Sequence, residues 1–138
     1  MDNPINQFIE IAPDSPTQQS RVPQTKGGKP TIATIEYALL SSQPYFYTLA
    51  ELKYATHVKH KEIPVAELEA HGEQLREAFF AKSYACMRAS PLTKQYGWGA
   101  HYDEKGGIAI YPVESKEYQN LTNDEGIKKF FAMRNKRG

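Results

Sequence analysis

The 138-residue sequence has little cysteine, no marked excess of either charge and no long apolar run. Its one cysteine, Cys86, cannot form an internal disulfide, and an unpaired thiol favours a reducing compartment. Seventeen Lys and Arg residues against sixteen Asp and Glu residues give a formal charge of +1. Nucleic-acid binders usually carry a basic excess, so nucleic acid is not an expected partner.

The lack of long apolar stretches also bears on the location of the protein. No segment approaches the roughly 18–20 apolar residues that a membrane-spanning helix needs. Residues 1–8 lack the basic start and the apolar segment of a secretory signal peptide. We therefore expect a cytoplasmic protein with no membrane partner.

The overall amino-acid composition is that of an ordinary globular domain. Hydrophobic residues make up 40% of the chain and charged residues 24%. We expect a single domain over residues 1–138. Residues 13–30 are rich in Pro, Gly, Ser, Thr and Gln and predict a long irregular connection, either functional or disordered. Residues 134–138 form a basic tail.

Helix signals recur along the chain as apolar residues at helical spacing, N-cap residues and prolines suited to a first turn. They predict helices over residues 32–40, 49–60, 64–82, 115–121 and 124–133. The clearest start is the capping-box pair Thr48 and Glu51. The 64–82 helix carries an apolar stripe of Leu68, Leu75 and Phe79.

Alternating apolar residues and turn signals predict the strands. They fall at residues 8–12, 84–90, 99–103 and 108–113. Together with the helices they indicate an α+β fold: a small antiparallel sheet of about four strands, including a 99–113 hairpin, with helices packed mainly on one face.

The hairpin turn decides which way His101 points. A three-residue loop places Asp103 at its first position and Gly106 at the left-handed one, both favourable choices. Tyr102 then lies opposite Ile108 on an apolar face, and His101, Asp103 and Tyr111 share the other face. A two-residue turn would mix polar and apolar side chains, so we choose the first register.

The stretch from Arg88 to His101 holds the only Trp together with cationic, aromatic and turn residues. Such groups suit a pocket for a small anionic ligand. The residues predicted to line it are Arg88, Lys94, Tyr96, Trp98 and His101.

An enzyme is an alternative interpretation. Arg88 lies on the same face of the predicted 84–90 strand as Cys86 and would favour its thiolate, although most unpaired cysteines are small, inert, buried thiols. If that strand pairs with the hairpin, Cys86 would be a nucleophile, His101 its base and Asp103 the group that orients the imidazole. No known catalytic motif is present, so enzymatic activity stays open.

A third interpretation is an interaction or structural protein, in the form of a homodimer. The chain contains nine Tyr and six Phe residues, which suit an interface. Pro112 places the second hairpin strand at an edge or near its end, where a partner has access.

Lys26-Gly-Gly-Lys29 precedes the first predicted helix, whose free N–H groups suit an anion. Pro30 stands where a phosphate-binding P-loop has Ser or Thr. The loop, Lys26, Gly27, Gly28 and Lys29, is therefore either an anion site or a flexible connection with solvated lysines.

Metal and cofactor signals are weak. His57 and His60 are three residues apart near the end of a predicted helix, with no third ligand positioned beside them. We expect no metal site and no cofactor.

The order of the motifs resembles a family of small, mostly bacterial proteins described only as a domain of unknown function. The resemblance covers nearly the whole chain and rests on Phe8-Ile-Glu-Ile11, Gly28-Lys-Pro-Thr-Ile-Ala33, Cys86-Met-Arg-Ala-Ser-Pro-Leu-Thr-Lys94, Tyr96-Gly-Trp-Gly-Ala-His101, Val113-Glu-Ser-Lys-Glu-Tyr118 and Met133-Arg-Asn-Lys-Arg137. It implies no substrate, cofactor or catalytic residue.

Overall fold

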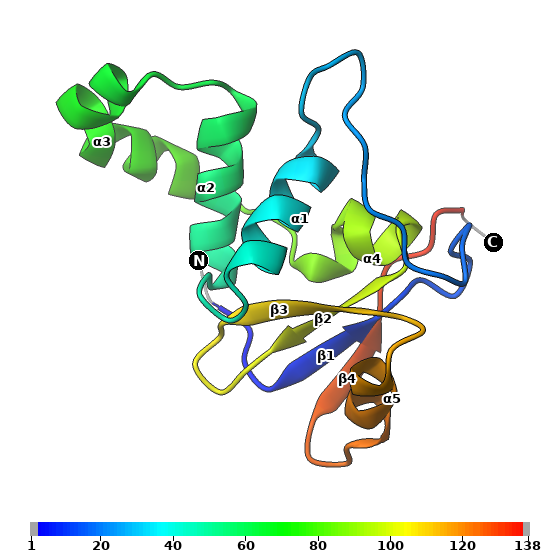
Figure 1. Ribbon diagram of the computed structural model, residues 1–138. Helices are drawn as coiled ribbons and strands as arrows, with labels where there is room; N and C mark the ends of the chain where they lie inside the picture. The colour runs from blue at the N-terminus through cyan, green and yellow to red at the C-terminus, as the bar shows by residue number, and fades with distance from the viewer. Residues whose placement is uncertain (1–2, 137–138) are drawn as a thin grey trace.

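The computed structural model describes residues 3–136 and has an α+β fold built on one open sheet (Figure 1). The strands are β1 (Gln7–Glu10), β2 (Trp98–Tyr102), β3 (Ile108–Pro112) and β4 (Lys128–Phe131), in the order β3-β2-β1-β4. The β3–β2 and β2–β1 pairs are antiparallel, whereas β1 and β4 are parallel. The α+β prediction is confirmed, with a sheet that is mostly antiparallel.

Helices cover both faces of the sheet unequally. They are α1 (Ile32–Ser42), α2 (Leu49–His60), α3 (Val65–Phe80), α4 (Pro91–Gln95) and α5 (Lys116–Asn123). Helices α1, α2 and α4 lie on one face, α5 lies on the other, and α3 extends away from the sheet (Figure 1). None of the described helices is long and apolar enough to cross a membrane.

Local signals placed the first four predicted helices correctly. At the start of α2, the Glu51 N–H donates to the Thr48 hydroxyl and the Thr48 N–H donates to the Glu51 carboxylate, which completes the predicted capping box. Along α3, by contrast, only Phe79 of the predicted apolar stripe is fully buried.

The two faces of the sheet form two cores because side chains alternate along each strand. Ile9, Ala100 and Tyr102 face α1, α2 and α4 in the larger core. On the other face Phe8 packs against Tyr118 of α5, with ring centroids 5.0 Å apart.

The hairpin has the predicted register. Tyr102 pairs with Ile108, the Gly106 N–H donates to the Asp103 carbonyl, and Gly106 has a φ of 86°. The Asp103 carboxylate also accepts from the Gly107 N–H at 2.8 Å, so this aspartate holds the turn closed.

The predicted strand over residues 84–90 is wrong. Met87–Ala89 is a short 3-10 helix, and side chains satisfy the Met87 backbone. The Met87 N–H donates to the Tyr102 hydroxyl at 2.9 Å, and the Thr93 hydroxyl donates to the Met87 carbonyl at 2.6 Å. The Ser90–Pro91 helix start bends the chain immediately afterwards, so the segment cannot run along the sheet.

The predicted helix over residues 124–133 is also wrong, because α5 extends through Asn123 and Asp124 ends it in an extended conformation. The following residues form β4, which pairs in parallel with β1. Pairing with a strand from the other end of the chain overrides the local helix signal.

The connection over residues 13–30 contains no helix or strand, yet contacts hold it in place. The Arg21 N–H donates to the Tyr96 carbonyl, and Ser20 donates two hydrogen bonds to the Glu114 carboxylate. The Asp14 carboxylate accepts from the backbone N–H groups of Asn135 and Lys136, which anchors the described part of the basic tail. Residues 137 and 138 lie outside the described residues.

Candidate functional site

The five residues predicted to bind a ligand do not face one space. Trp98 and His101 stand on opposite faces of β2. The Trp98 indole donates to the Arg21 carbonyl at 2.9 Å, which ties the 13–30 connection to the sheet.

The Arg88 side chain and the Lys94 backbone have partners near the end of the chain. The Arg88 guanidinium donates to the Phe131 carbonyl at 2.8 Å, and its own carbonyl accepts from the Met133 N–H, so Arg88 covers part of the outer edge of β4. The Lys94 carbonyl accepts from the Asn135 amide. Tyr96 lines a hollow beside the start of α1.

His101 belongs to a hydrogen-bonded group on the α5 face of the sheet. The Tyr45 hydroxyl lies 2.8 Å from both His101 Nδ1 and the Tyr111 hydroxyl. Burial lowers the pKa of His101, and the charges of Asp103 and Asp124 partly oppose this shift. The predicted meeting of His101 and Tyr111 on one face is therefore confirmed, with Tyr45 joining them.

The predicted gathering of Cys86 and Arg88 with His101 is wrong, because it required the 84–90 strand. Cys86 packs against the larger core, on the side of the sheet opposite the His101 ring. Asp103 uses its carboxylate to accept from two N–H groups of the hairpin turn. The catalytic roles assigned to Cys86, His101 and Asp103 stay a prediction without geometric support.

The Lys26–Lys29 loop forms a tight two-residue turn. Lys26 and Lys29 exchange backbone hydrogen bonds of 3.1 and 3.0 Å, and Gly27 and Gly28 both have positive φ. Thr31 caps α1 through its side chain, which already satisfies one free N–H of that helix. Anion binding at this loop stays a prediction.

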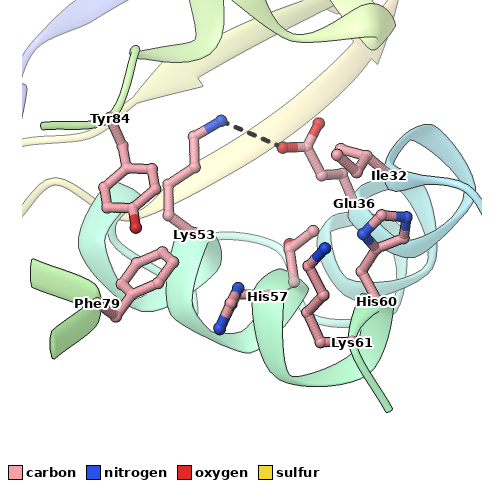
Figure 2. Close-up of a pocket in the computed structure, with 9 residues that line it drawn as sticks. Ile32, Glu36, Lys53, His57, His60, Lys61, Phe79 and Tyr84 are labelled. Atoms are coloured by element: carbon pink, nitrogen blue, oxygen red, sulfur yellow. Dashed lines mark hydrogen bonds and ion pairs between the residues drawn. The ribbon is translucent and has the colours of Figure 1, made fainter. Parts of the chain in front are cut away.

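Side chains from α1, α2 and the Phe79–Tyr84 region surround one mostly apolar pocket of about 310 Å³ (Figure 2). The residues that line it are Ile32, Glu36, Lys53, Thr56, His57, His60, Lys61, Phe79 and Tyr84. Such a pocket, with a few polar groups among apolar walls, is the usual form of a small-molecule site.

Two of the residues that line this α1–α2 pocket have buried polar side chains. Glu36 is 0% exposed; its carboxylate accepts from the Ser90 hydroxyl at 2.7 Å and forms an ion pair with Lys53 at 3.5 Å. Thr56 is 5% exposed, and its hydroxyl has no hydrogen-bond partner among residues 3–136. A buried hydroxyl is nearly always paired in a folded protein, so Thr56 is exceptional.

The walls are aromatic and the rim is cationic. The Phe79 and Tyr84 rings stack with centroids 4.1 Å apart and an interplanar angle of 12°. His60 and Lys61 lie at the end of α2, across the pocket from Tyr84, whereas the His57 ring packs against Phe79 with centroids 4.8 Å apart (Figure 2). Burial, followed by the nearby Lys61 and His60 charges, lowers the pKa of His57 and favours its neutral form.

Comparison with models of known protein families assigns the chain to one family. A model of a family of unknown function (DUF6157) matches residues 1–138. The chain belongs to this family. No curated protein and no solved structure matches it. The family resemblance predicted from the motifs is therefore confirmed, and the DUF6157 description names no activity.

The sequence contained one usable signal for the pocket of this DUF6157 member. Glu36 lies within the apolar stripe of α1, four residues after Ile32 and three before Leu39. A carboxylate in that position must be paired or take part in a site. Nothing local indicated its partner Lys53 on α2 or Tyr84 beyond α3.

The histidines of α2 have no set of metal ligands around them in the part of the chain that the structure describes. Within residues 3–136 no group of three or more His, Cys, Asp or Glu side chains is arranged to hold a metal ion. His57 and His60 lie in the last turn of α2.

Proposed function

We propose that this DUF6157 member binds a small anionic ligand in the α1–α2 pocket. The observation that carries the proposal is an apolar pocket of about 310 Å³ that is bordered by Lys61, whose ammonium forms no ion pair with another described residue.

The charges around the pocket favour an anion. Two lysines and two histidines line it against one carboxylate. Lys53 neutralises Glu36, whereas Lys61 forms no ion pair with any other described residue. An incoming anion therefore meets an available ammonium beside a pocket of low polarity, where the attraction is stronger than in open water.

This proposal retains the ligand class predicted from the sequence and changes its location. Glu36, Lys53 and Thr56 line one space together, whereas Trp98 and His101 face opposite sides of the sheet. The common space supports the α1–α2 pocket over the Arg88–His101 segment. The proposed location of the protein is the cytoplasm, where the free thiol of Cys86 stays reduced.

Two alternatives stay predictions. Light scattering at high protein concentration tests the homodimer, for which Phe131 at the outer edge of the sheet offers exposed aromatic surface. The rate of Cys86 alkylation by iodoacetamide, compared with that of free cysteine, tests the thiol-dependent enzyme.

Calorimetric titration with a panel of small carboxylates and phosphates tests the proposal. We expect at least one anion to bind the wild-type protein and to bind Lys61→Ala several-fold more weakly, because the variant lacks the available ammonium. The matched control is Lys59→Ala, which removes another exposed lysine near the end of α2 that does not line this pocket. Failure of every anion to bind, or equal weakening in both variants, contradicts the proposal.

A further inference from the structure

We infer that the anion is an aliphatic monocarboxylate, in which a single carboxylate heads an unbranched apolar chain. The inference rests on the proposed function and adds the chemical class of the ligand. Three features of the α1–α2 pocket carry it: polar groups that are hidden from the space, an aliphatic residue that is exposed in it, and one available positive charge at its rim.

The polar groups of this pocket lie beneath its surface. Glu36 is completely buried and is paired with Ser90 and Lys53, and the Thr56 hydroxyl is buried as well. A ligand therefore meets few hydrogen-bonding groups inside the pocket. A sugar, or another body rich in hydroxyl groups, would lose hydrogen bonds to water there without replacing them, which is costly.

Ile32 offers apolar surface that a chain is able to cover. It is the first residue of α1, is 43% exposed and lies across the pocket from Tyr84 (Figure 2). Each CH2 group that a ligand buries against such surface contributes about 0.8 kcal/mol. The exposed side chain therefore favours a ligand whose body is apolar.

The aromatic residues of the pocket do not call for an aromatic ligand. Phe79 is buried and already packs against four neighbouring rings. They are those of Tyr54, His57, Phe80 and Tyr84, with centroids between 4.1 and 5.5 Å from that of Phe79. The ring contacts of Phe79 are thus made within the protein, and a flexible chain suits the exposed aliphatic surface better than a flat ring.

The rim provides charge for one carboxylate. The Lys61 ammonium forms no ion pair with another described residue, whereas the Lys53 ammonium lies 3.5 Å from the Glu36 carboxylate. Burial lowers the pKa of His57 and favours its neutral form. A ligand with two or three negative charges would therefore leave charge unpaired beside a pocket of low polarity. A single carboxylate pairs with Lys61 at the rim while its chain points inward.

Calorimetric titration with straight-chain carboxylates tests the class. The probes are butanoate, hexanoate and octanoate, each used below the concentration at which it forms micelles, and hexanedioate, which has a second carboxylate at the far end of its chain. We expect the affinity of the wild-type protein to rise about two- to fourfold for each added CH2 group until the chain fills the pocket. Hexanedioate should bind at least about tenfold more weakly than hexanoate, because its second carboxylate would enter the apolar space.

Two substitutions assign the two ends of the ligand. Ile32→Ala removes exposed apolar surface from the pocket, so we expect a smaller gain in affinity per CH2 group. Lys61→Ala should weaken the binding of every chain length by a similar factor and keep the gain per CH2 group, because the carboxylate and the chain make separate contacts. The matched control is Val65→Ala, which removes an exposed apolar residue from the first position of α3, outside the pocket.

The outcomes separate the inference from the proposed function. The inference is overturned by an affinity that does not rise with chain length, by hexanedioate binding as tightly as hexanoate, or by equal effects of Ile32→Ala and Val65→Ala on the gain per CH2 group. Binding of other anions that is weakened by Lys61→Ala would then still support the proposed function. If no anion binds the wild-type protein, both are overturned.

Discussion

Thr56 and Thr93 show how one kind of side chain takes opposite roles in a single core. Both are buried, at 5% and 0% exposure. The Thr93 hydroxyl donates to the Met87 carbonyl at 2.6 Å and holds the 3-10 turn, whereas the Thr56 hydroxyl is unpaired among the described residues. Replacing each hydroxyl by a methyl group therefore has opposite consequences for folding.

We expect Thr56→Val to raise the free energy of unfolding of the unliganded protein by about 1 kcal/mol, because an unpaired buried hydroxyl is removed. Thr93→Val should lower it by about 1–3 kcal/mol, because the Met87 carbonyl loses its buried donor. Urea unfolding of both variants measures the two changes. Destabilisation by Thr56→Val would show that its hydroxyl is paired in solution.

At the scale of elements, the Tyr45–Tyr47 segment covers the outer edge of β3. The Tyr45 N–H donates to the Ile108 carbonyl, and the Ile108 N–H donates to the Tyr47 carbonyl. Tyr45 has a φ of 63°, a strained value for a residue with a side chain, and its ring reaches His101 on the other face. The strain is offset by contacts that protect an open sheet edge.

Gly107 permits this covering because the Tyr45 backbone passes against its Cα. A Cβ at residue 107 would overlap the Tyr45 carbonyl. We expect Gly107→Ala to displace the segment and to lower the free energy of unfolding by about 1–3 kcal/mol. The matched control is Gly72→Ala in α3, where a Cβ meets open space beside the non-helical break at His71, so we expect a change within about 0.5 kcal/mol. Equal effects of the two changes in urea unfolding would contradict this.

The helices and strands differ in how far local sequence predicts them. The Thr48–Glu51 capping box and the Asp103–Gly106 turn were predictable because each depends on hydrogen bonds within a few residues. The 3-10 turn at Met87 was not, because its hydrogen bonds come from Tyr102 and Thr93. Strand β4 was missed because its partner β1 lies at the other end of the chain.

The whole molecule responds to acid through two sets of groups. His101 and His57 have pKa values lowered by burial, so the folded protein favours their neutral forms. Asp14 and Glu114 have pKa values lowered by hydrogen bonds, from Asn135 and Ser20 respectively. Protonation of the histidines therefore opposes folding as the pH falls below their unfolded pKa of 6.5, and protonation of the carboxylates follows at lower pH.

The contribution of His101 to this pH dependence of stability can be measured separately from that of the other groups. The stabilisation from neutral His101 is complete above pH 6.5, its unfolded pKa, and is lost as the pH falls through the lowered folded value. The substitution His101→Asn keeps an acceptor for the Tyr45 hydroxyl and removes the titration. We expect the wild-type protein to lose more stability than the variant between about pH 7 and pH 5. Parallel curves of unfolding free energy against pH would contradict the assignment.

The sequence by itself determined the α+β class, the starts of four helices and the hairpin register, because short-range hydrogen bonds and side-chain periodicity set these features. The prediction missed Glu36, although its place on the apolar stripe of α1 was a signal that the sequence contained. Only the tertiary structure decided that Glu36 meets Lys53, that Thr56 is left without a partner among the described residues, and that Cys86 and His101 stand on opposite sides of the sheet. These outcomes depend on which distant segments pack together, and the free energy of that packing is a property of the whole chain.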